Sequence, residues 1–279
     1  MRAIDLEHMG REHVICCWEV DGVLVDPGPQ SCEETLVAAL DGEVPRALLL
    51  THIHFDHAGA AGALVHRWPD VPVYVHQRGA RHLADPERLV ASATQLFGED
   101  GMRELWGEVV AVPEANLRVL EGGESGVEGA FRVAYTPGHA SHHVSYLHED
   151  TGTAFVGDVG GVRIPPASFT MAPTPPPDVD IEAWETSLQT LRDWDPQTLA
   201  LTHFGAVQEV GAQLDVVRER LYEELRLADE RDMESFVEAW SARVRAEAGE
   251  AAEAYLQAAP PDHLFLGLER WRSRQAEVS

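Results

Sequence analysis

The sequence has no apolar run that approaches the ~20 residues of a membrane-spanning helix, so we expect no membrane partner. The stretch Met1–His8 is acidic and lacks the apolar core of a signal peptide. Cysteine is scarce: the 279 residues include only 3, an odd number without the spacing of a disulfide framework. From these absences we expect a cytoplasmic protein in which adjacent Cys16 and Cys17 are packed thiols.

Basic residues are also few. The chain has 21 lysines and arginines against 47 aspartates and glutamates, which gives a net charge of −26. Because phosphate binding requires a basic surface, this balance disfavours a nucleic-acid partner and weakens a nuclease or phosphodiesterase function. The length allows a large core, arranged as one domain with additions or as two small domains. We therefore expect a small-molecule substrate.

Three histidines and an aspartate fall within six residues, directly after the apolar run Ala47–Leu50. The run is typical of a buried parallel strand, and the carboxyl ends of such strands are where open α/β layers place their sites. His52 and His54 are two apart, so they point the same way on an extended chain. Asp56 and His57 follow after the chain turns and aim at a second position. The pattern predicts metal binding, because imidazole and carboxylate groups are ligands for zinc, iron, manganese or nickel.

Three more ligand types stand just beyond later strand-like runs: His139, Asp158 and His203. Each has an ordinary explanation when taken singly. Asp158 lies in a Gly-Asp pair, which is common in turns. His139 could be an ordinary loop histidine, and His203 could be a histidine packed in the core. Their ordered recurrence at strand ends favours all three as ligands.

The motifs together resemble the metallo-β-lactamase superfamily, and they occur in the order that the family has. The sequence that flanks these motifs is similar to that of the glyoxalase II and lactonase-type hydrolases. Lactamases of the family commonly carry a cysteine near the position of Asp158, and no cysteine lies there, so antibiotic hydrolysis is not expected. Upstream, the segment that begins at Asp26 resembles the family's Asp-x-Gly turn. Asp26 is then either a turn residue or a residue with a direct role in the site. The matching segments are Thr51–Gly59, Thr136–His139, Phe155–Asp158 and Leu201–His203.

The resemblance implies an α/β protein with the four-layer αββα sandwich of this family. We expect the catalytic domain to cover residues 1–208 and a helical extension to cover residues 209–279. Apolar residues recur at three- and four-residue steps over Val210–Leu225 and again over Met233–Val244, which predicts two amphipathic helices. Family members use such extensions to shape the substrate pocket or to form a homodimer.

Shorter signals predict several other elements. Asp21-Gly22 indicates a hairpin turn between two strands. Val71–Val75 is typical of a strand and Gln77–Leu83 of a short helix. Residues 181–194 suit a helix that precedes a strand at Leu199–Leu201.

The resemblance also implies a binuclear site with two divalent metal ions, most simply zinc, with iron or manganese as alternatives. In addition to ligation, Asp56 is expected to have a catalytic role, in which it hydrogen-bonds the nucleophile and helps to move its proton. The first ion would be held by His52, His54 and His139, the second by Asp56, His57 and His203, and Asp158 would bridge them.

The function expected from this site is hydrolysis of a small ester, thioester or lactone by a metal-bridging hydroxide. Two alternatives stay open. One is a mononuclear iron dioxygenase of the persulfide type on the same scaffold. The other is a metal-stabilised protein that binds a partner without catalysis.

Substrate contacts are expected from the segment Gly160–Pro177, where glycine and proline prevent regular structure. Arg163 is the candidate for an anionic substrate group, and Phe169 or Met171 for an apolar one. The alternative is a stiff connecting loop. His142 is a further candidate, as a substrate contact or a partner of a metal ligand, whereas a solvent-facing histidine at a strand start is the simpler interpretation for His142 and for its neighbour His143.

Overall fold

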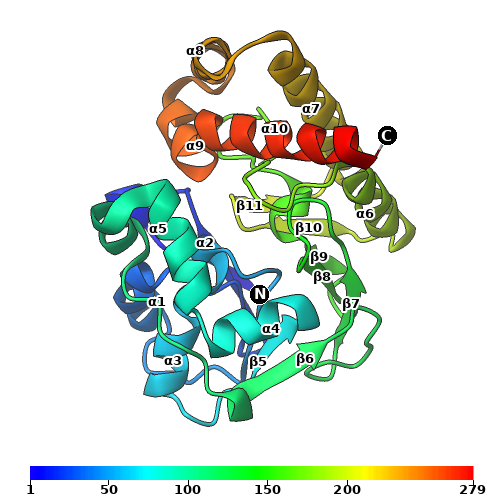
Figure 1. Cartoon of the computed structure of the whole chain (residues 1–279). Coiled ribbons are helices and arrows are strands. Elements are labelled where there is room, and N and C mark those ends of the chain that lie inside the picture. Colours follow the sequence, from blue (N-terminus) through cyan, green and yellow to red (C-terminus); the bar gives the residue numbers. More distant parts are fainter. Residues whose placement is uncertain (279) are drawn as a thin grey trace. The chain divides into compact units, whose positions relative to one another are not determined.

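The computed structural model describes residues 1–278, which form two compact units, and Figure 1 labels many of their helices and strands. The first unit comprises Met1–Tyr135 and Val144–Tyr146. The second comprises Thr136–His143 and the chain from Leu147 onward. Strands and helices occur in both units, in agreement with the expected α/β class.

The first unit contains a six-stranded mixed sheet whose strands follow the order of the chain. Strands β1 to β3 are antiparallel neighbours, and β3 to β6 are parallel. Asp21 and Gly22 join β2 to β3 with φ angles of 51° and 77°, so the predicted hairpin turn is confirmed. The strands are β1 (Arg2–Asp5), β2 (Cys16–Val20), β3 (Val23–Val25), β4 (Ala47–Leu49), β5 (Val73–His76) and β6 (Leu117–Leu120).

Strand β4 lies in the middle of this sheet, and all of its residues are fully buried. It pairs in parallel with β3 on one side and with β5 on the other. A strand with such surroundings must be apolar on both faces, which explains the uninterrupted run of alanine and leucine. The histidine-rich segment therefore begins where the most buried strand of the unit ends.

Helices of the first unit pack closely where the sequence supplies small residues. A side chain at Gly62, in α3, would place its Cβ 1.9 Å from the carbonyl oxygen of Val110, so only glycine fits this position. The elements are η1 (His8–Gly10), η2 (Gln30–Cys32), α1 (Glu33–Ala39), α2 (Phe55–Ala58), α3 (Ala61–Arg67), α4 (Gln77–Ala84), α5 (Glu87–Gly101), the π-helical turn η3 (Met102–Trp106) and η4 (Glu114–Asn116).

A second sheet has five strands in the order β11-β10-β9-β8-β7. Within the second unit, β9 and β10 are parallel neighbours, and β10 pairs with β11 in antiparallel fashion. Because the carboxyl ends of parallel strands lie at the same edge, the residues that follow β9 and β10 come side by side. The strands are β7 (Phe131–Tyr135), β8 (Val144–His148), β9 (Thr153–Phe155), β10 (Thr198–Leu201) and β11 (Gly205–Val207).

The C-terminal helices gather together in the second unit (Figure 1), where α10 contacts both α7 and α8. Leu214 and Leu221 of α7 and Phe236 and Trp240 of α8 are completely buried, so both predicted amphipathic stripes are confirmed. The elements are η5 (Gly157–Gly160), α6 (Ile181–Asp193), α7 (Val210–Glu230), α8 (Met233–Ala248), η6 (Gly249–Ala251), α9 (Ala252–Ala258) and α10 (Pro261–Val278).

The segment between η5 and α6 is irregular, as its prolines and glycines predict, apart from one bridge between Val162 and Met171. Buried side chains of the C-terminal helices fasten it. The Tyr255 hydroxyl accepts a hydrogen bond from the Ile164 amide at 2.7 Å, and Glu224 Oε1 accepts one from the Ala172 amide at 3.1 Å. The extension thus packs on this segment as well as on itself.

Two further expectations concern the three cysteines and the lack of a membrane-spanning helix. Cys16, Cys17 and Cys32 are all buried and none forms a disulfide, in agreement with packed thiols. Burial raises the pKa of the Cys32 thiol to about 11. Among residues 1–278, no helix combines the length and the apolar content that crossing a membrane requires.

Candidate metal centre

The first ligand cluster, which comprises His52, His54, Asp56 and His57, follows β4 in the first unit. Nε2 of His52 lies 3.0 Å from Nδ1 of His54, so these two side chains converge as their spacing predicts. Asp56 and His57 stand on the short helix α2. The ring centroids of His52 and His57 are 4.0 Å apart, so the helix returns its histidine to the first pair.

Asp26 fixes the orientation of this cluster from within the core, where it is completely buried. Its Oδ1 accepts a hydrogen bond from the Thr51 amide, and its Oδ2 accepts from the Thr51 hydroxyl, both at 2.8 Å. The same Oδ2 lies 2.8 Å from Nδ1 of His57. Asp26 has a left-handed φ of 52°, so it is a turn residue and an orienting residue at once. The Asp-x-Gly signal located this residue, but sequence reasoning missed its buried partners.

This network assigns the tautomers of two histidines. The Thr51 hydroxyl has one proton, which it donates to Asp26, so Thr51 Oγ1 accepts from Nδ1 of His52 at 3.1 Å. Nδ1 of His57 likewise donates to the carboxylate. Both rings therefore present Nε2 as a lone pair, which is the arrangement that a carboxylate produces at histidine metal ligands.

The second ligand cluster comprises His139, Asp158 and His203, all of them buried. Asp158 follows β9 and His203 follows β10, so the parallel pairing of these strands brings the two residues together. Nε2 of His203 lies 3.6 Å from Oδ1 of Asp158, and Nε2 of His139 lies 3.2 Å from Oδ2. The second unit thus assembles three of the predicted ligands.

His139 is held from behind by the irregular segment. Its Nδ1 donates to the carbonyl oxygen of Pro173 at 2.8 Å, and its ring meets Trp184 edge to face at 5.9 Å between centroids. The chain approaches so closely that a Cβ at Gly138 would lie 2.4 Å from Cα of Trp184, and its φ of 139° also requires glycine. Because a carbonyl only accepts, the proton is on Nδ1 and Nε2 is a lone pair.

With these tautomers, hydrogen-bond acceptors of histidine rings face acceptor oxygens of carboxylates. The lone pair of His139 Nε2 faces a carboxylate oxygen of Asp158 at 3.2 Å. In the first cluster, the lone pair of His57 Nε2 faces Oδ2 of Asp56 at 3.8 Å. Such pairs repel unless a proton or a metal cation lies between them. The residues present therefore fit a divalent metal, and their imidazole and carboxylate groups suit zinc, iron or manganese.

The remaining predicted residues meet different outcomes. Arg163 is half-buried beside the backbone of His203, to which it donates a hydrogen bond at 2.6 Å. His142 is half-buried in the loop that carries His139. His143 does not face solvent: it is completely buried, with Nδ1 3.0 Å from the Thr136 hydroxyl. The simple interpretation of that histidine is therefore wrong.

Phe169 and Met171, the candidates for an apolar substrate group, lie in the core instead of at a surface. The Phe169 ring is 5.5 Å from Tyr255 and 6.3 Å from Trp240 between centroids. Aromatic side chains of the C-terminal helices therefore pack on Phe169, and Met171 is completely buried. The prediction of a substrate contact is therefore wrong for these two.

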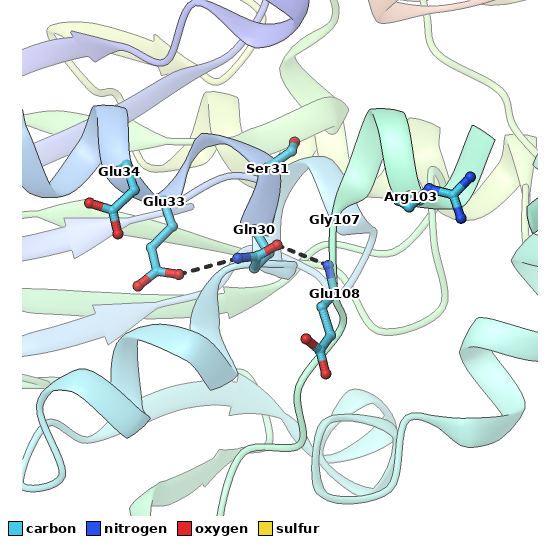
Figure 2. A pocket seen from close by; sticks show the side chains of 7 residues that line it. All are labelled: Gln30, Ser31, Glu33, Glu34, Arg103, Gly107 and Glu108. Carbon is cyan, nitrogen blue, oxygen red and sulfur yellow. Dashed lines mark hydrogen bonds between the residues drawn. The ribbon is translucent and has the colours of Figure 1, made fainter. Parts of the chain in front are cut away.

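The first unit also has a hollow of about 460 Å³ (Figure 2). Gln30 links two of its lining segments, since its Nε2 donates to Glu33 at 3.4 Å and its Oε1 accepts from the Glu108 amide at 2.9 Å. No member of the first ligand cluster lines it, and its carboxylates disfavour an anionic ligand. Its lining residues are Gln30, Ser31, Glu33, Glu34, Arg103, Gly107 and Glu108.

Comparison with known proteins agrees with the geometry. A family model described as the metallo-beta-lactamase superfamily matches residues 19–255. The probable metallo-hydrolase YqgX of Bacillus subtilis is 36% identical over 50% of this chain and 63% of its own length. A hydroxyacylglutathione hydrolase of Xanthomonas euvesicatoria is 34% identical over 57% of this chain and 50% of its own length. This chain thus spans between half and two thirds of these two relatives.

Two solved structures are similar over larger shares. ST1585 from Sulfolobus tokodaii, an archaeal metallo-beta-lactamase superfamily protein, has a TM-score of 0.73 and 22% identity, covering 98% of both chains. TTHA1623, solved in a di-iron-bound form, has a TM-score of 0.54 and 28% identity. It covers 73% of this chain and 93% of its own. The first similarity concerns the fold, and the second extends to a protein that holds metal.

Proposed function

The chain belongs to the metallo-β-lactamase superfamily, and we propose that it is a binuclear metal-dependent hydrolase of a small ester, thioester or lactone. It has the family's α/β fold with two mixed sheets and helices, and it is a hydrolase of that fold. Proteins of this superfamily bind divalent metals. The number of ions, their identity and the substrate class form the proposal.

One observation carries it: in each unit, a histidine whose tautomer is fixed by hydrogen bonds presents a lone pair toward a carboxylate oxygen. Two acceptors that face each other do not stabilise the fold. They are, however, well placed to bind a cation between them. The proposed ligands are His52, His54 and His139 for one ion, Asp56, His57 and His203 for the other, and Asp158 for both.

When bound, two divalent cations supply Lewis acidity toward the substrate carbonyl and lower the pKa of a water that they share. The chain's own residues do the rest. Asp26 and the Pro173 carbonyl hold the imidazoles in the tautomer that ligation needs. Asp56, half-buried and 3.8 Å from His57, accepts the proton of the attacking water and hands it to the leaving group.

Zinc is the proposed metal, because the five imidazoles of the proposed ligand set are groups that zinc commonly binds. The di-iron form of TTHA1623 makes iron the second candidate. The ester, thioester or lactone class draws support from the hydroxyacylglutathione hydrolase relative, whose name denotes a thioester substrate.

The test is elemental analysis of gently purified protein, joined to a panel of ester, thioester, lactone and phosphodiester substrates with and without a chelator. We expect about two metal ions per chain and a turnover that the chelator abolishes and added metal restores. About one iron per chain with oxygen consumption would support a mononuclear dioxygenase instead. Metal without turnover of any member of the panel would support a non-catalytic binding protein.

A further inference from the structure

Arg163 is held rigidly next to a proposed metal ligand. It follows Asp158 by five residues. Its amide donates to the His203 carbonyl at 2.6 Å, and its own carbonyl accepts from the Phe204 amide at 3.3 Å. The next residue, Ile164, is fixed by the buried Tyr255 hydroxyl. The backbone of Arg163 is therefore tied to the second ligand cluster on one side and to the C-terminal helices on the other.

The side chain of Arg163 has a neutral partner. Its Nη1 lies 3.4 Å from Oε1 of Gln213, a residue of α7 that is 3% exposed. Nε2 of Gln213 in turn donates to the Gly160 carbonyl at 3.0 Å, which fixes the direction of the amide. No carboxylate among residues 1–278 forms an ion pair with Arg163.

Neighbouring arginines of the same unit show how unusual this is. Arg192, Arg218 and Arg220 each form an ion pair with a carboxylate. So do Arg243 and Arg272. With 47 acidic residues against 21 basic ones, carboxylate partners are abundant in this chain. Arg163 is half-buried and has only a glutamine as its side-chain partner, so its positive charge is not neutralised by a carboxylate of the chain. Such a charge favours the binding of an anion.

A guanidinium has five N–H donors in a planar fork that matches a carboxylate. Gln213 uses one end of this fork and holds the group without neutralising it. We propose that Arg163 binds a carboxylate of the substrate, so that the enzyme prefers esters and thioesters that carry a negative charge. This inference rests on the proposed function, because it names the substrate class of that same site. It also gives the C-terminal extension a role in specificity, since α7 supplies Gln213.

The carboxylate could belong to the acyl part or to the leaving group, and matched substrate pairs separate these two. For the acyl part, 4-nitrophenyl butyrate is compared with mono-4-nitrophenyl glutarate, which adds one terminal carboxylate to the same chain. For the leaving group, the butyryl thioester of N-acetylcysteamine is compared with that of 3-mercaptopropionate. In at least one pair, we expect the metal-loaded enzyme to have the higher kcat/KM for the anionic member.

Arg163→Gln removes the charge and keeps a hydrogen-bonding side chain of similar reach. A hydrogen bond between charged groups contributes about 10- to 100-fold in binding. We therefore expect Arg163→Gln to lower kcat/KM at least about 10-fold more for the anionic member than for the neutral one. Arg163→Lys should recover part of the preference. Gln213→Glu should weaken it as well, because a carboxylate there would occupy the guanidinium.

Arg218→Gln is the matched control, because Arg218 is an exposed residue of α7 paired with Glu185. It removes the same charge from the chain and should leave the anionic preference unchanged. An equal loss for both members of each pair in Arg163→Gln would overturn the inference and give Arg163 a purely structural role. An unchanged preference in that variant would overturn it too, and thermal unfolding of each variant establishes that it folds.

A binding measurement keeps this inference separate from the proposed function. Glutaric acid monoanilide and butyranilide have the two acyl groups in a form that resists hydrolysis. Isothermal titration calorimetry should show tighter binding of the anionic anilide to the metal-loaded wild type than to Arg163→Gln, and equal binding of the neutral one. If the wild type hydrolyses none of the esters or thioesters, the proposed function fails, while the calorimetry still decides whether Arg163 recognises an anion.

Discussion

The two ligand clusters are built in opposite ways. In the first unit, four candidate ligands come from six consecutive residues, and their main support, Asp26, lies on the turn after the neighbouring strand. In the second unit, three candidate ligands come from three separate segments, each at the end of a strand or in a loop. They are supported by the Pro173 carbonyl and by Trp184, which are distant in sequence.

This difference shows two routes to the same chemistry. A local motif needs only one buried strand and one turn to aim its side chains, because residue spacing already sets their directions. A dispersed cluster depends on parallel strand pairing and on a segment that has no regular structure of its own. The first cluster should therefore tolerate changes in the C-terminal helices, whereas the second should be sensitive to them.

The largest expected effect is the loss of a ligand in either cluster. Asp158→Ala and His54→Ala should each reduce bound metal and abolish turnover together, by more than the roughly 10- to 100-fold that a supporting residue contributes. Elemental analysis and kcat/KM on the best ester of the panel measure both. Asp150→Ala, in the exposed turn after β8, is the control. Full activity in a folded variant that has lost its metal would contradict the proposed site.

Removal of Asp26 tests how far the first cluster depends on a single support. Asp26→Asn keeps the shape but places an amide between Thr51 and His57, so the ring tautomers are no longer imposed. We expect metal affinity to fall about 10- to 100-fold, as measured by competition with a chromogenic chelator. Asp21→Asn, on the exposed hairpin turn, should have no effect. Unchanged affinity in Asp26→Asn would show that spacing alone orients the cluster.

The second cluster should respond to the C-terminal helices through Tyr255. Its buried hydroxyl accepts from the Ile164 amide and donates to the Phe169 carbonyl, which anchors the irregular segment. Burial raises the pKa of Tyr255 to about 12, so the hydroxyl keeps its proton. Tyr255→Phe should lower the free energy of unfolding by about 1–3 kcal/mol, because it leaves the buried amide unsatisfied.

Chemical denaturation measures that effect, with Tyr222→Phe as the exposed control on α7. If Tyr255→Phe were as stable as the wild type, the irregular segment would not need its anchor. The proposed sensitivity of the second cluster to the extension would then lose its basis.

The smallest expected effect concerns Glu224, the other anchor of that segment. Burial raises the pKa of this carboxyl well above its ordinary value of 4.5. The folded protein therefore holds a proton that the unfolded chain releases above that pH, so stability is greatest below it and is lost as the pH rises. Glu224→Gln should match the wild type near pH 4.5 and exceed its stability by about 1 kcal/mol at pH 8.

Thermal unfolding across this pH range measures the difference, with the exposed Glu219→Gln as control. A constant difference between Glu224→Gln and the wild type at all pH values would mean that the carboxyl does not titrate on unfolding.

Most of the elements were predictable, and the reasons are local. The hairpin at Asp21 and Gly22 follows from turn chemistry, and α7 and α8 follow from apolar periodicity. What sequence reasoning got wrong lies at His143, which is buried, and in the irregular segment. Phe169 was expected to contact an apolar substrate group, but nothing in a proline-rich stretch reveals which of its side chains the later helices will cover.

The sequence by itself determined the metal chemistry of this protein. Spacing and strand polarity put His52 and His54 together and placed Asp56 and His57 on the turn that follows, since these positions follow from the backbone over a few residues. Only the tertiary structure decided what supports these ligands. It buried Asp26 under the first cluster, set the Pro173 carbonyl behind His139 and left Arg163 with a neutral partner. Such contacts join residues far apart in the chain, and no local pattern encodes them.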